Sequence, residues 1–230
     1  MMIDILSDER LDDLQCKGYQ IIQKPEGFCF GIDAVLLADF TKVKPKNQVL
    51  DICSGTGIIP ILLAAKTKGE SFIGLEIQKD YVEMANRSAK YNHIEDKVKI
   101  AAGDVKEIKS LFPAASFHVV TANPPYMTMG HGLSNPYEPK NIARHEVLLS
   151  LKDVIFAASY ALEANGSFFM IHKPFRLAEI FEVMKQHDLE PKRMRLVHPY
   201  LDKEPTMVLI EGAKGGKPRI TIEPPLVMYE

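Results

Sequence analysis

The sequence predicts an α/β protein built on a doubly wound, mostly parallel β-sheet. From residue 48 onward, short apolar runs alternate with longer amphipathic stretches, which is the pattern of successive βαβ units. A glycine-bearing turn follows the first apolar run, at the place where sheets of this class hold a cofactor. The length of 230 residues suits one such domain with extensions rather than two domains.

The apolar runs and the periodic stretches give the expected order of elements. Parallel strands are predicted at residues 49–52, 72–76, 98–101, 118–121 and 167–171, and helices at residues 58–66, 80–91, 147–163 and 175–186. Two further strands are predicted at residues 193–198 and 207–211. The link between these last two is too short for a crossover helix, so they should pair antiparallel.

The first 46 residues differ in character from the rest of the chain. Residues 15–23 are typical of a strand, and a helical pattern begins near Asp33 and leads to a lysine-bearing linker. We interpret residues 1–46 as a cap over the cofactor edge of the sheet and residues 47–230 as the catalytic domain. A long irregular segment, residues 127–144, is typical of a lid over a site; a disordered insertion is the alternative.

Composition argues against several classes of protein. The net charge of −2 gives no overall signature of nucleic-acid binding, so any such surface must be local. Three widely spaced cysteines argue against disulfides and thiolate zinc sites, and the seven histidines show no metal-ligand spacing. The chain starts without a signal peptide and has no apolar run long enough to span a membrane, so a cytoplasmic protein is expected. Nothing in the sequence indicates the oligomeric state.

Residues 51–57, with the sequence DICSGTG, form the first candidate site. The two glycines allow the backbone to approach a ligand at the end of the first parallel strand. A dinucleotide fingerprint would need a small residue where this chain has Pro60, which disfavours a nicotinamide oxidoreductase. Asp51 would repel a phosphate and attract an ammonium. S-adenosylmethionine carries an ammonium and a sulfonium, and we predict that it binds at Asp51, Ser54, Gly55, Thr56 and Gly57.

The next two strands also end in polar residues that suit this cofactor. Glu76, with Ile77 after it, stands at the separation from the glycines at which an acidic side chain meets a ribose diol. Asp104 follows the third strand and is a candidate acceptor for the adenine amino group of the cofactor. The alternatives are a solvated charge at Glu76 and a helix cap at Asp104. The predicted cofactor site therefore also includes Glu76, Ile77, Gly103, Asp104 and Val105.

Asn123-Pro124-Pro125-Tyr126 ends the fourth strand and is the most specific signal in the sequence. The amino group of a flat base or amide is a poor nucleophile because its lone pair is delocalised. The side-chain oxygen of Asn123 and the carbonyl of Pro124 can accept both of its hydrogens, and Tyr126 offers a face for stacking. We predict that Asn123, Pro124 and Tyr126 are catalytic, that Asn123 also contacts the cofactor, and that Pro125 and Tyr126 bind the substrate. A merely rigid turn is the alternative.

These motifs resemble those of the class I, Rossmann-like methyltransferases that methylate amino groups of adenine, cytosine or glutamine. Residues 28–38 (FCFGIDAVLLA) and 143–146 (ARHE) extend the resemblance to the bacterial enzymes that N6-methylate an adenine next to the anticodon of a valine tRNA. The resemblance implies a seven-stranded sheet with its last strand antiparallel, S-adenosylmethionine as cofactor, and tRNA bound at its anticodon loop. Arg144 is the best single candidate for an RNA contact, and the basic residues of 192–195 and 214–219 are others.

Other acceptors and one other class of protein fit parts of this pattern. A glutamine in a translation release factor would suit the same chemistry, but such enzymes usually carry a longer helical N-terminal domain than the first 45 or so residues provide. Methylation of DNA adenine would call for an added target-recognition domain. A non-catalytic adenosine-ligand binding module would keep the acidic and glycine residues but has no need of Asn123 and Tyr126.

Overall fold

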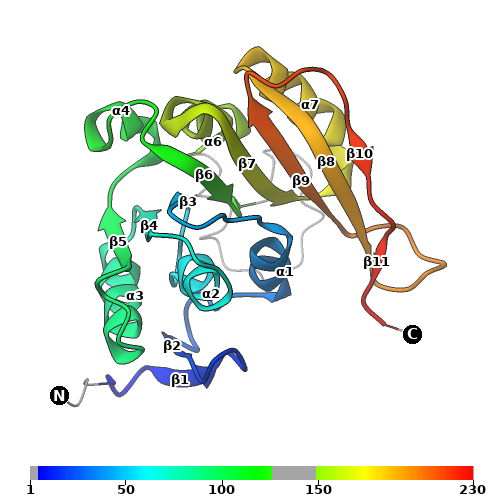
Figure 1. The fold of residues 1–230 in the computed structure, drawn as a ribbon. Helices are drawn as coiled ribbons and strands as arrows, with labels where there is room; N and C mark the ends of the chain where they lie inside the picture. Colours follow the sequence, from blue (N-terminus) through cyan, green and yellow to red (C-terminus); the bar gives the residue numbers. More distant parts are fainter. Residues whose placement is uncertain (1–4, 126–148, 230) are drawn as a thin grey trace.

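Parallel strands form the centre of the sheet. The computed structural model describes residues 5–125 and 149–229, and Figure 1 shows helices on both faces of its sheet. The parallel strands are β3 (Gln48–Ile52), β4 (Ser71–Glu76), β5 (Val98–Ala102), β6 (Phe117–Ala122) and β7 (Leu162–His172), in the spatial order β5-β4-β3-β6-β7. The prediction of a doubly wound parallel sheet is confirmed. Strand β7 begins at residue 162 rather than 167, directly after the preceding helix.

Antiparallel strands extend the sheet beyond β7. Strand β9 (Met207–Lys214) pairs antiparallel with β7 and with β8 (Leu189–His198), as the short link between β8 and β9 predicted. The C-terminal segment adds β10 (Thr221–Ile222) and β11 (Leu226–Val227), which pair parallel with β8. The sheet therefore has nine strands in the described part of the chain, where the resemblance implied seven. The two added strands have two residues each, too few for a periodic signal.

Helices cover the two faces of the sheet through separate apolar clusters. On one face lie α1 (Ile32–Phe40), α2 (Ile58–Lys66) and α3 (Lys79–Tyr91); on the other lie α4 (Ile108–Leu111), α6 (Leu151–Ala161) and α7 (Leu177–Gln186). Short 3-10 turns, Val105–Glu107 and Pro174–Arg176, precede α4 and α7. A capping box between Ser150 and Asp153 starts α6 four residues later than predicted, at 151 rather than 147. No helix among the described residues is long and apolar enough to cross a membrane.

An N-terminal hairpin packs against α3. Its strands are β1 (Arg10–Asp13) and β2 (Gln20–Gln23), of which the sequence predicted only the second. The backbone N–H of Ile22 donates to Ser88 Oγ at 3.0 Å. A side chain of α3 therefore accepts a hydrogen bond from the edge of β2 that faces away from β1. After the hairpin, Phe28 lies beside Gly55 in the turn that follows β3, residues 53–57, which we call the glycine turn. The chain then enters α1. The division at residue 46 stays a prediction.

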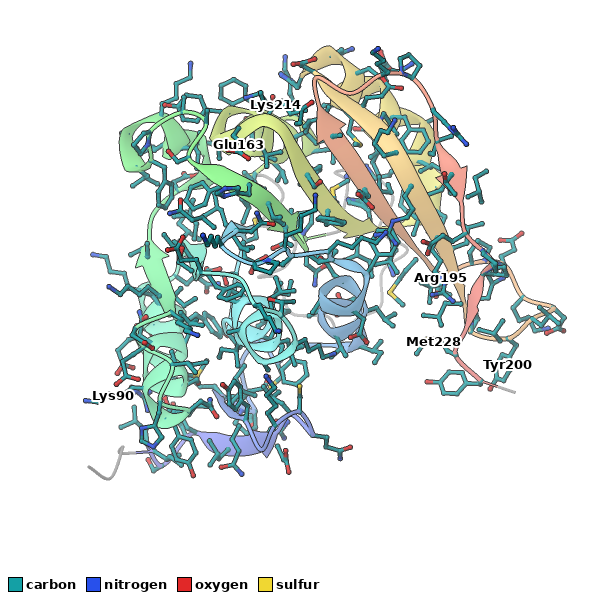
Figure 2. The ribbon with its side chains drawn as sticks, in the orientation of Figure 1. Lys90, Glu163, Arg195, Tyr200, Lys214 and Met228 are labelled. Carbon is teal, nitrogen blue, oxygen red and sulfur yellow. The ribbon has the colours of Figure 1, made fainter. Side chains whose placement is uncertain are left out.

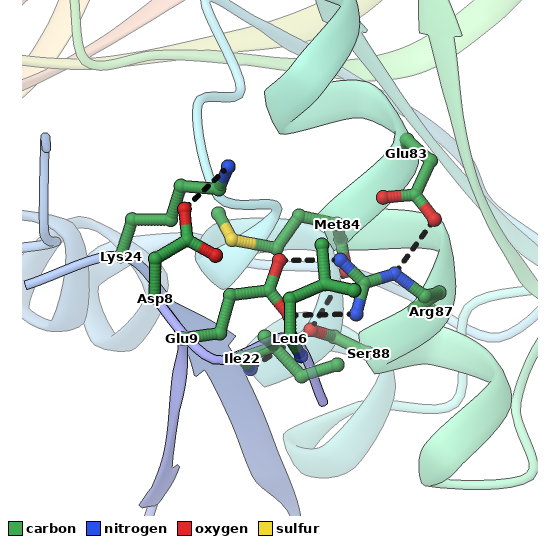
Figure 3. A network of polar contacts seen from close by, with 9 residues as sticks. All are labelled: Leu6, Asp8, Glu9, Ile22, Lys24, Glu83, Met84, Arg87 and Ser88. Atoms are coloured by element: carbon green, nitrogen blue, oxygen red, sulfur yellow. Dashed lines mark hydrogen bonds and ion pairs between the residues drawn. The ribbon is translucent and has the colours of Figure 1, made fainter. Parts of the chain in front are cut away.

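A buried ion pair joins the start of the chain to α3 (Figure 3). Both carboxylate oxygens of Glu9 accept from the guanidinium of Arg87, at 2.8 and 2.5 Å. Arg87 Nε also donates to Glu83 on its own helix, at 2.6 Å. The Glu9 side chain has no exposed surface, whereas that of Glu83 is 61% exposed. The hydrogen bonds from Arg87 hold the pKa of Glu9 below its ordinary value, and the bidentate pair fastens the hairpin to α3.

Arg193 on β8 ties the C-terminal segment to the sheet. It donates to Glu211 on β9 at 2.5 Å and to Glu223 near the C-terminus at 2.9 Å. It also donates to the carbonyl of Phe40 at 2.8 Å, and its guanidinium lies 3.7 Å from the centre of the Phe40 ring. The basic run 192–195 was a candidate for RNA phosphate contacts, but Arg193 is largely buried and engaged inside the protein.

The neighbouring basic residues of β8 also hold the C-terminal segment. Arg195 Nε donates to the carbonyl of Pro224 at 3.0 Å, and Lys192 Nζ donates to the carbonyl of Lys217 at 2.8 Å. Figure 2 shows Arg195 beside the last residues of the chain, on the side of the sheet farthest from α3. The C-terminal segment, whose role the sequence did not indicate, thus forms the edge of the sheet next to β8.

The Glu9–Arg87 pair predicts a cost for removing the buried carboxylate. Glu9→Ala should lower the free energy of unfolding by about 2–4 kcal/mol, because Arg87 loses its bidentate partner in a largely buried position. Urea denaturation at pH 7 measures this loss. The control Glu83→Ala removes an exposed partner of the same arginine and should cost less than about 1 kcal/mol.

The same pair gives a direction for the pH dependence. Because the pKa of Glu9 is lowered in the folded state, its stabilisation is present above the ordinary value of 4.5 and is lost as the pH falls through the lowered pKa. The stabilities of the wild type and Glu9→Ala should therefore converge in acid. Equal losses for Glu9→Ala and Glu83→Ala at pH 7 would contradict the assignment of the clamp to Glu9.

Candidate functional site

The parallel register brings four strand ends to one edge of the sheet. Ile52 at the end of β3 pairs with Leu75 of β4 on one side and with Ala122 of β6 on the other, and β5 lies parallel beyond β4. The segments that leave these strands are residues 53–57, 77–78, 103–105 and 123–125. The structure thus brings the predicted cofactor and acceptor residues together. Two predicted site residues, Tyr126 and Arg144, lie outside the described part of the chain.

The turn after β3 adopts a backbone that favours glycine at two positions. Gly55 (φ 54°) and Gly57 (φ 77°) both lie in the left-handed region, and Gly57 is the N-cap of α2. A Cβ at Gly57 would lie 2.9 Å from the Cβ of Ala85 in α3, so the turn packs too tightly for a larger residue. A Cβ at Gly55 would lie 3.2 Å from the ring of Phe28, which places this exposed aromatic against the turn. Sequence reasoning did not name Phe28 as a site residue.

Glu76 holds the glycine turn in place. Its side chain is buried; Oε2 accepts from the N–H of Gly55 and Oε1 from that of Gln78, each at 2.9 Å. The alternative of a solvated charge is therefore wrong. A carboxylate oxygen can accept more than one hydrogen bond, so the ribose contact stays a prediction that these bonds do not prevent.

Asp51 lies buried beneath the turn. Its side chain has no exposed surface, and Oδ1 accepts from the hydroxyl of Thr121 on β6 at 2.6 Å. Burial raises the pKa of Asp51 to about 7, the nearby hydroxyls of Thr121 and Ser54 oppose this rise, and negative Glu76 adds to it. The carboxylate is closed off from direct ligand contact in this structure. Its negative charge would therefore attract a cationic ligand through the turn, without a direct contact.

Buried polar atoms around the turn lack hydrogen-bond partners among the described residues. They are Asp51 Oδ2, Ser54 Oγ and Thr56 Oγ1. A buried polar atom left unpaired costs about 1–3 kcal/mol. Ser54 lies close enough to Asp51 to lower its pKa, and Asp51 and Thr56 have no exposed surface. A buried water, or a ligand after a small shift of the turn, would therefore complete the hydrogen bonding here.

Acidic side chains give this edge a negative potential. Burial raises the pKa of Cys53 well above its ordinary value, and negative Glu76, Asp51 and Asp104 raise it further. Such a potential suits a cationic ligand and opposes a phosphate. Together with the unpaired buried atoms, it makes the site fit S-adenosylmethionine, the cofactor predicted from the sequence. In residues 5–125 and 149–229, no group of three or more His, Cys, Asp or Glu side chains could hold a metal ion.

Of the predicted cofactor residues around the ends of β4 and β5, some have structural roles and one is exposed. Asp104 Oδ1 accepts from the N–H of Lys106 at 2.9 Å and caps the following 3-10 turn, which is the alternative role considered for it. Val105 is buried in the core, and a Cβ at Gly103 would lie 2.6 Å from Leu111. Ile77 is 48% exposed at the sheet edge. The cofactor contacts of Ile77, Gly103, Asp104 and Val105 stay predictions.

Asn123 leaves β6 and meets the first turn of α1. Its Nδ2 donates to Asp33 Oδ2 at 3.1 Å, although the two residues are 90 positions apart. Asn123 and Pro125 are half-buried and Pro124 is buried. The prolines fix their own φ and supply no N–H, which keeps the backbone of the turn rigid. The sequence indicated Asp33 only as the start of a helix; its approach to Asn123 depends on where α1 packs, which no local pattern encodes.

Known proteins resemble this chain in sequence and in fold. A family model described as "Methyltransferase domain" matches residues 43–192. The chain is 29% identical over 206 residues to the tRNA1(Val) (adenine(37)-N6)-methyltransferase of Porphyromonas gingivalis, a match that covers 87% of this chain and 80% of that protein.

Two solved structures share the fold. The crystal structure of a predicted O-methyltransferase from Agrobacterium tumefaciens has a TM-score of 0.68 at 23% identity and covers 85% of this chain and 87% of its own. A geranyl diphosphate C-methyltransferase from Streptomyces coelicolor, solved with S-adenosyl-L-homocysteine, has a TM-score of 0.60 at 14% identity and covers 80% of this chain and 75% of its own.

The solved structures support the fold, and the family model shows the family. The structural likenesses confirm the predicted class I methyltransferase fold, with a mostly parallel sheet and antiparallel strands at its C-terminal end. The family model spans well over half of the chain and includes the glycine turn, Glu76, Asp104 and Asn123. By this match, the chain belongs to the methyltransferase domain family.

Proposed function

We propose that this protein is an S-adenosylmethionine-dependent N-methyltransferase that methylates N6 of an adenine next to the anticodon of a tRNA. The observation that carries the proposal is the placement of Asn123-Pro124 beside the acid-lined glycine turn, at one edge of the sheet. The choice of acceptor is supported by the name of the relative in Porphyromonas gingivalis, which specifies adenine N6 in a tRNA.

The cofactor would lie over the glycine turn and the ends of β4 and β5. When bound, S-adenosylmethionine supplies an electrophilic methyl group carried by its sulfonium. The turn offers close backbone approach, unpaired buried hydroxyls and the negative charge of Asp51 to its cationic tail. Farther along the edge, Glu76 would accept from the ribose hydroxyls and Asp104 from the adenine amino group. The residues proposed to bind it are Asp51, Ser54, Gly55, Thr56, Gly57, Glu76, Ile77, Gly103, Asp104, Val105 and Asn123.

The acceptor nitrogen would be activated by two hydrogen-bond acceptors. Asn123 Oδ1 and the carbonyl of Pro124 would each take one N–H of the adenine amino group. These bonds favour a tetrahedral nitrogen whose lone pair faces the methyl group, and the rigid turn holds both oxygens in position. The methylated nitrogen is acidic and loses its proton afterwards, so no strong general base is required.

An anticodon loop suits a site of this kind. Loop bases are already partly unstacked, so extruding one costs less than flipping a base out of a duplex. Tyr126 is proposed to stack on the extruded base and Arg144 to contact the RNA nearby; both follow from the sequence alone.

The acceptor can be tested directly by nucleoside mass spectrometry. Purified protein and S-adenosylmethionine are incubated with tRNA from cells that lack the gene, and the tRNA is digested to nucleosides. N6-methyladenosine should appear in the tRNA only when protein and cofactor are both present. Absence of this nucleoside, with a methylated glutamine in a release factor under the same conditions, would replace the tRNA by a protein acceptor.

Asn123→Ala separates catalysis from cofactor binding. Loss of one of the two acceptors should lower kcat by about 100-fold or more, because the amino group is no longer held for attack. The dissociation constant of S-adenosyl-L-homocysteine, measured by calorimetry, should change by less than about threefold, because Asn123 is only one of the proposed cofactor contacts and the glycine turn is untouched. Unchanged methyl transfer would remove Asn123 from the mechanism.

The raised pKa of Asp51 predicts a pH-dependent contribution to cofactor binding. With a pKa of about 7, Asp51 is mostly uncharged at pH 6 and mostly charged at pH 8. The affinity of the wild type for S-adenosyl-L-homocysteine, divided by that of Asp51→Asn, should therefore rise by about three- to tenfold between pH 6 and pH 8. The ratio cancels the titration of the ligand's own amino group. A ratio that stays flat would show that the charge of Asp51 does not reach the ligand.

A further inference from the structure

The N-terminal segment supplies a carboxylate to the turn that carries Asn123. Asp33 stands in the first turn of α1, and its Oδ2 accepts from Asn123 Nδ2 at 3.1 Å. We infer that Asp33 is a positioning residue, which fixes the orientation of the Asn123 amide and strengthens Asn123 Oδ1 as an acceptor for the substrate amino group. The inference deepens the proposed function and rests on it, because it assigns Asn123 the task of holding that amino group.

The chemistry of the pair settles which way the amide faces. An ionised carboxylate is an acceptor only, and an asparagine amide has one donating and one accepting end. Asn123 must therefore turn its NH₂ toward Asp33. Its Oδ1 then points away from Asp33, on the other side of the Cβ–Cγ bond. Without the carboxylate, the orientation that presents Oδ1 to the substrate loses its hydrogen bond from Nδ2 to Asp33. The flipped amide presents a donor where the reaction needs an acceptor.

The charge of Asp33 adds to this geometric effect. An amide whose N–H donates to an anion shifts electron density toward its oxygen, which makes Oδ1 a stronger acceptor. The attacking nitrogen gains positive charge as the new bond forms, so a stronger acceptor on its N–H stabilises the transition state more than the ground state. Asp33 acts through Asn123 in this scheme and needs no contact with the substrate.

The local structure holds the Asp33 carboxylate in place. Its Oδ1 accepts from the backbone N–H of Ala34 at 3.0 Å, which leaves Oδ2 directed at Asn123. A Cβ at Gly31 would lie 2.7 Å from Asp33 Oδ1, so the glycine before the helix leaves the space that the carboxylate occupies. Helix α1 is itself anchored by its buried residues Ala34, Leu37, Ala38 and Phe40.

The test combines variants of Asp33 with a matched control on the same helix. Asp33→Ala removes the acceptor and the charge, whereas Asp33→Asn keeps an oxygen that can accept from Asn123. Asp39→Asn makes the same change of charge at the other end of α1, where Asp39 is exposed and pairs with Lys66. We expect kcat to fall by about 100-fold in Asp33→Ala and about tenfold in Asp33→Asn, and to stay within about twofold in Asp39→Asn. KM for tRNA and binding of S-adenosyl-L-homocysteine should change by less than about threefold.

A double-mutant cycle with Asn123→Ala distinguishes positioning from general support of the fold. If Asp33 acts through Asn123, adding Asp33→Ala to Asn123→Ala should change kcat by less than about twofold. Effects that multiply in the double variant would overturn the inference, and so would an Asp33→Ala variant with wild-type kcat.

A readout without substrate keeps the inference separate from the proposed acceptor. In ¹⁵N-edited NMR spectra, the side-chain amide pair of Asn123 is identified by its disappearance in Asn123→Ala. This pair should shift in Asp33→Ala and stay in place in Asp39→Asn; an unmoved pair in Asp33→Ala overturns the inference. If tRNA is not methylated at all while the pair shifts, the proposed acceptor fails and the Asp33–Asn123 contact stands.

Discussion

The parallel pairing of β3 with strands on both sides brings the predicted functional residues of this protein together. Because β4 and β6 run in the same direction as β3, the segments that leave these strands meet at one edge, with the glycine turn between Glu76 and Asn123. The chain winds from β3 through β4 to β5 on one side and then crosses to β6 on the other side of β3, so this edge also marks the switch point of the sheet. A slip in either pairing would separate the cofactor residues from the acceptor residues.

Buried acids around β3 hold the turn and also create the potential at this edge. Glu76 uses both oxygens on backbone N–H groups, and Asp51 bonds to Thr121 on the adjacent strand. Burial raises the pKa of Asp51 to about 7, and the negative charge of Glu76 adds to that rise. Such an arrangement costs stability in the free protein, and a cationic ligand would recover part of that cost on binding.

Sequence patterns predicted the central fold and the clustering of the site, but not the contacts that cross the chain. Periodicity located β3 to β9 and α2 within a few residues, because each buries a continuous apolar face. Strand β1 is half-exposed and β10 and β11 have two residues each, so they carry no such pattern. The roles of Glu9, Asp33 and Arg193 depend on partners at least 18 positions away, and a single charged residue gives no sign of its distant partner.

The distribution of negative charge around the site matches the direction in which charge would move during the proposed reaction. In that reaction, methyl transfer would take positive charge away from the sulfur of a cofactor held by the glycine turn and deliver it to a nitrogen held by Asn123. Asp51 and Glu76 lie on the side that loses the charge, so alone they would stabilise the bound cofactor more than the transition state. A negative group on the acceptor side would stabilise the charge that develops on the nitrogen. Asp33, which accepts from Asn123 Nδ2 at 3.1 Å, is one such carboxylate among the described residues. The N-terminal segment would therefore contribute to the rate, and not only to the cover of the sheet.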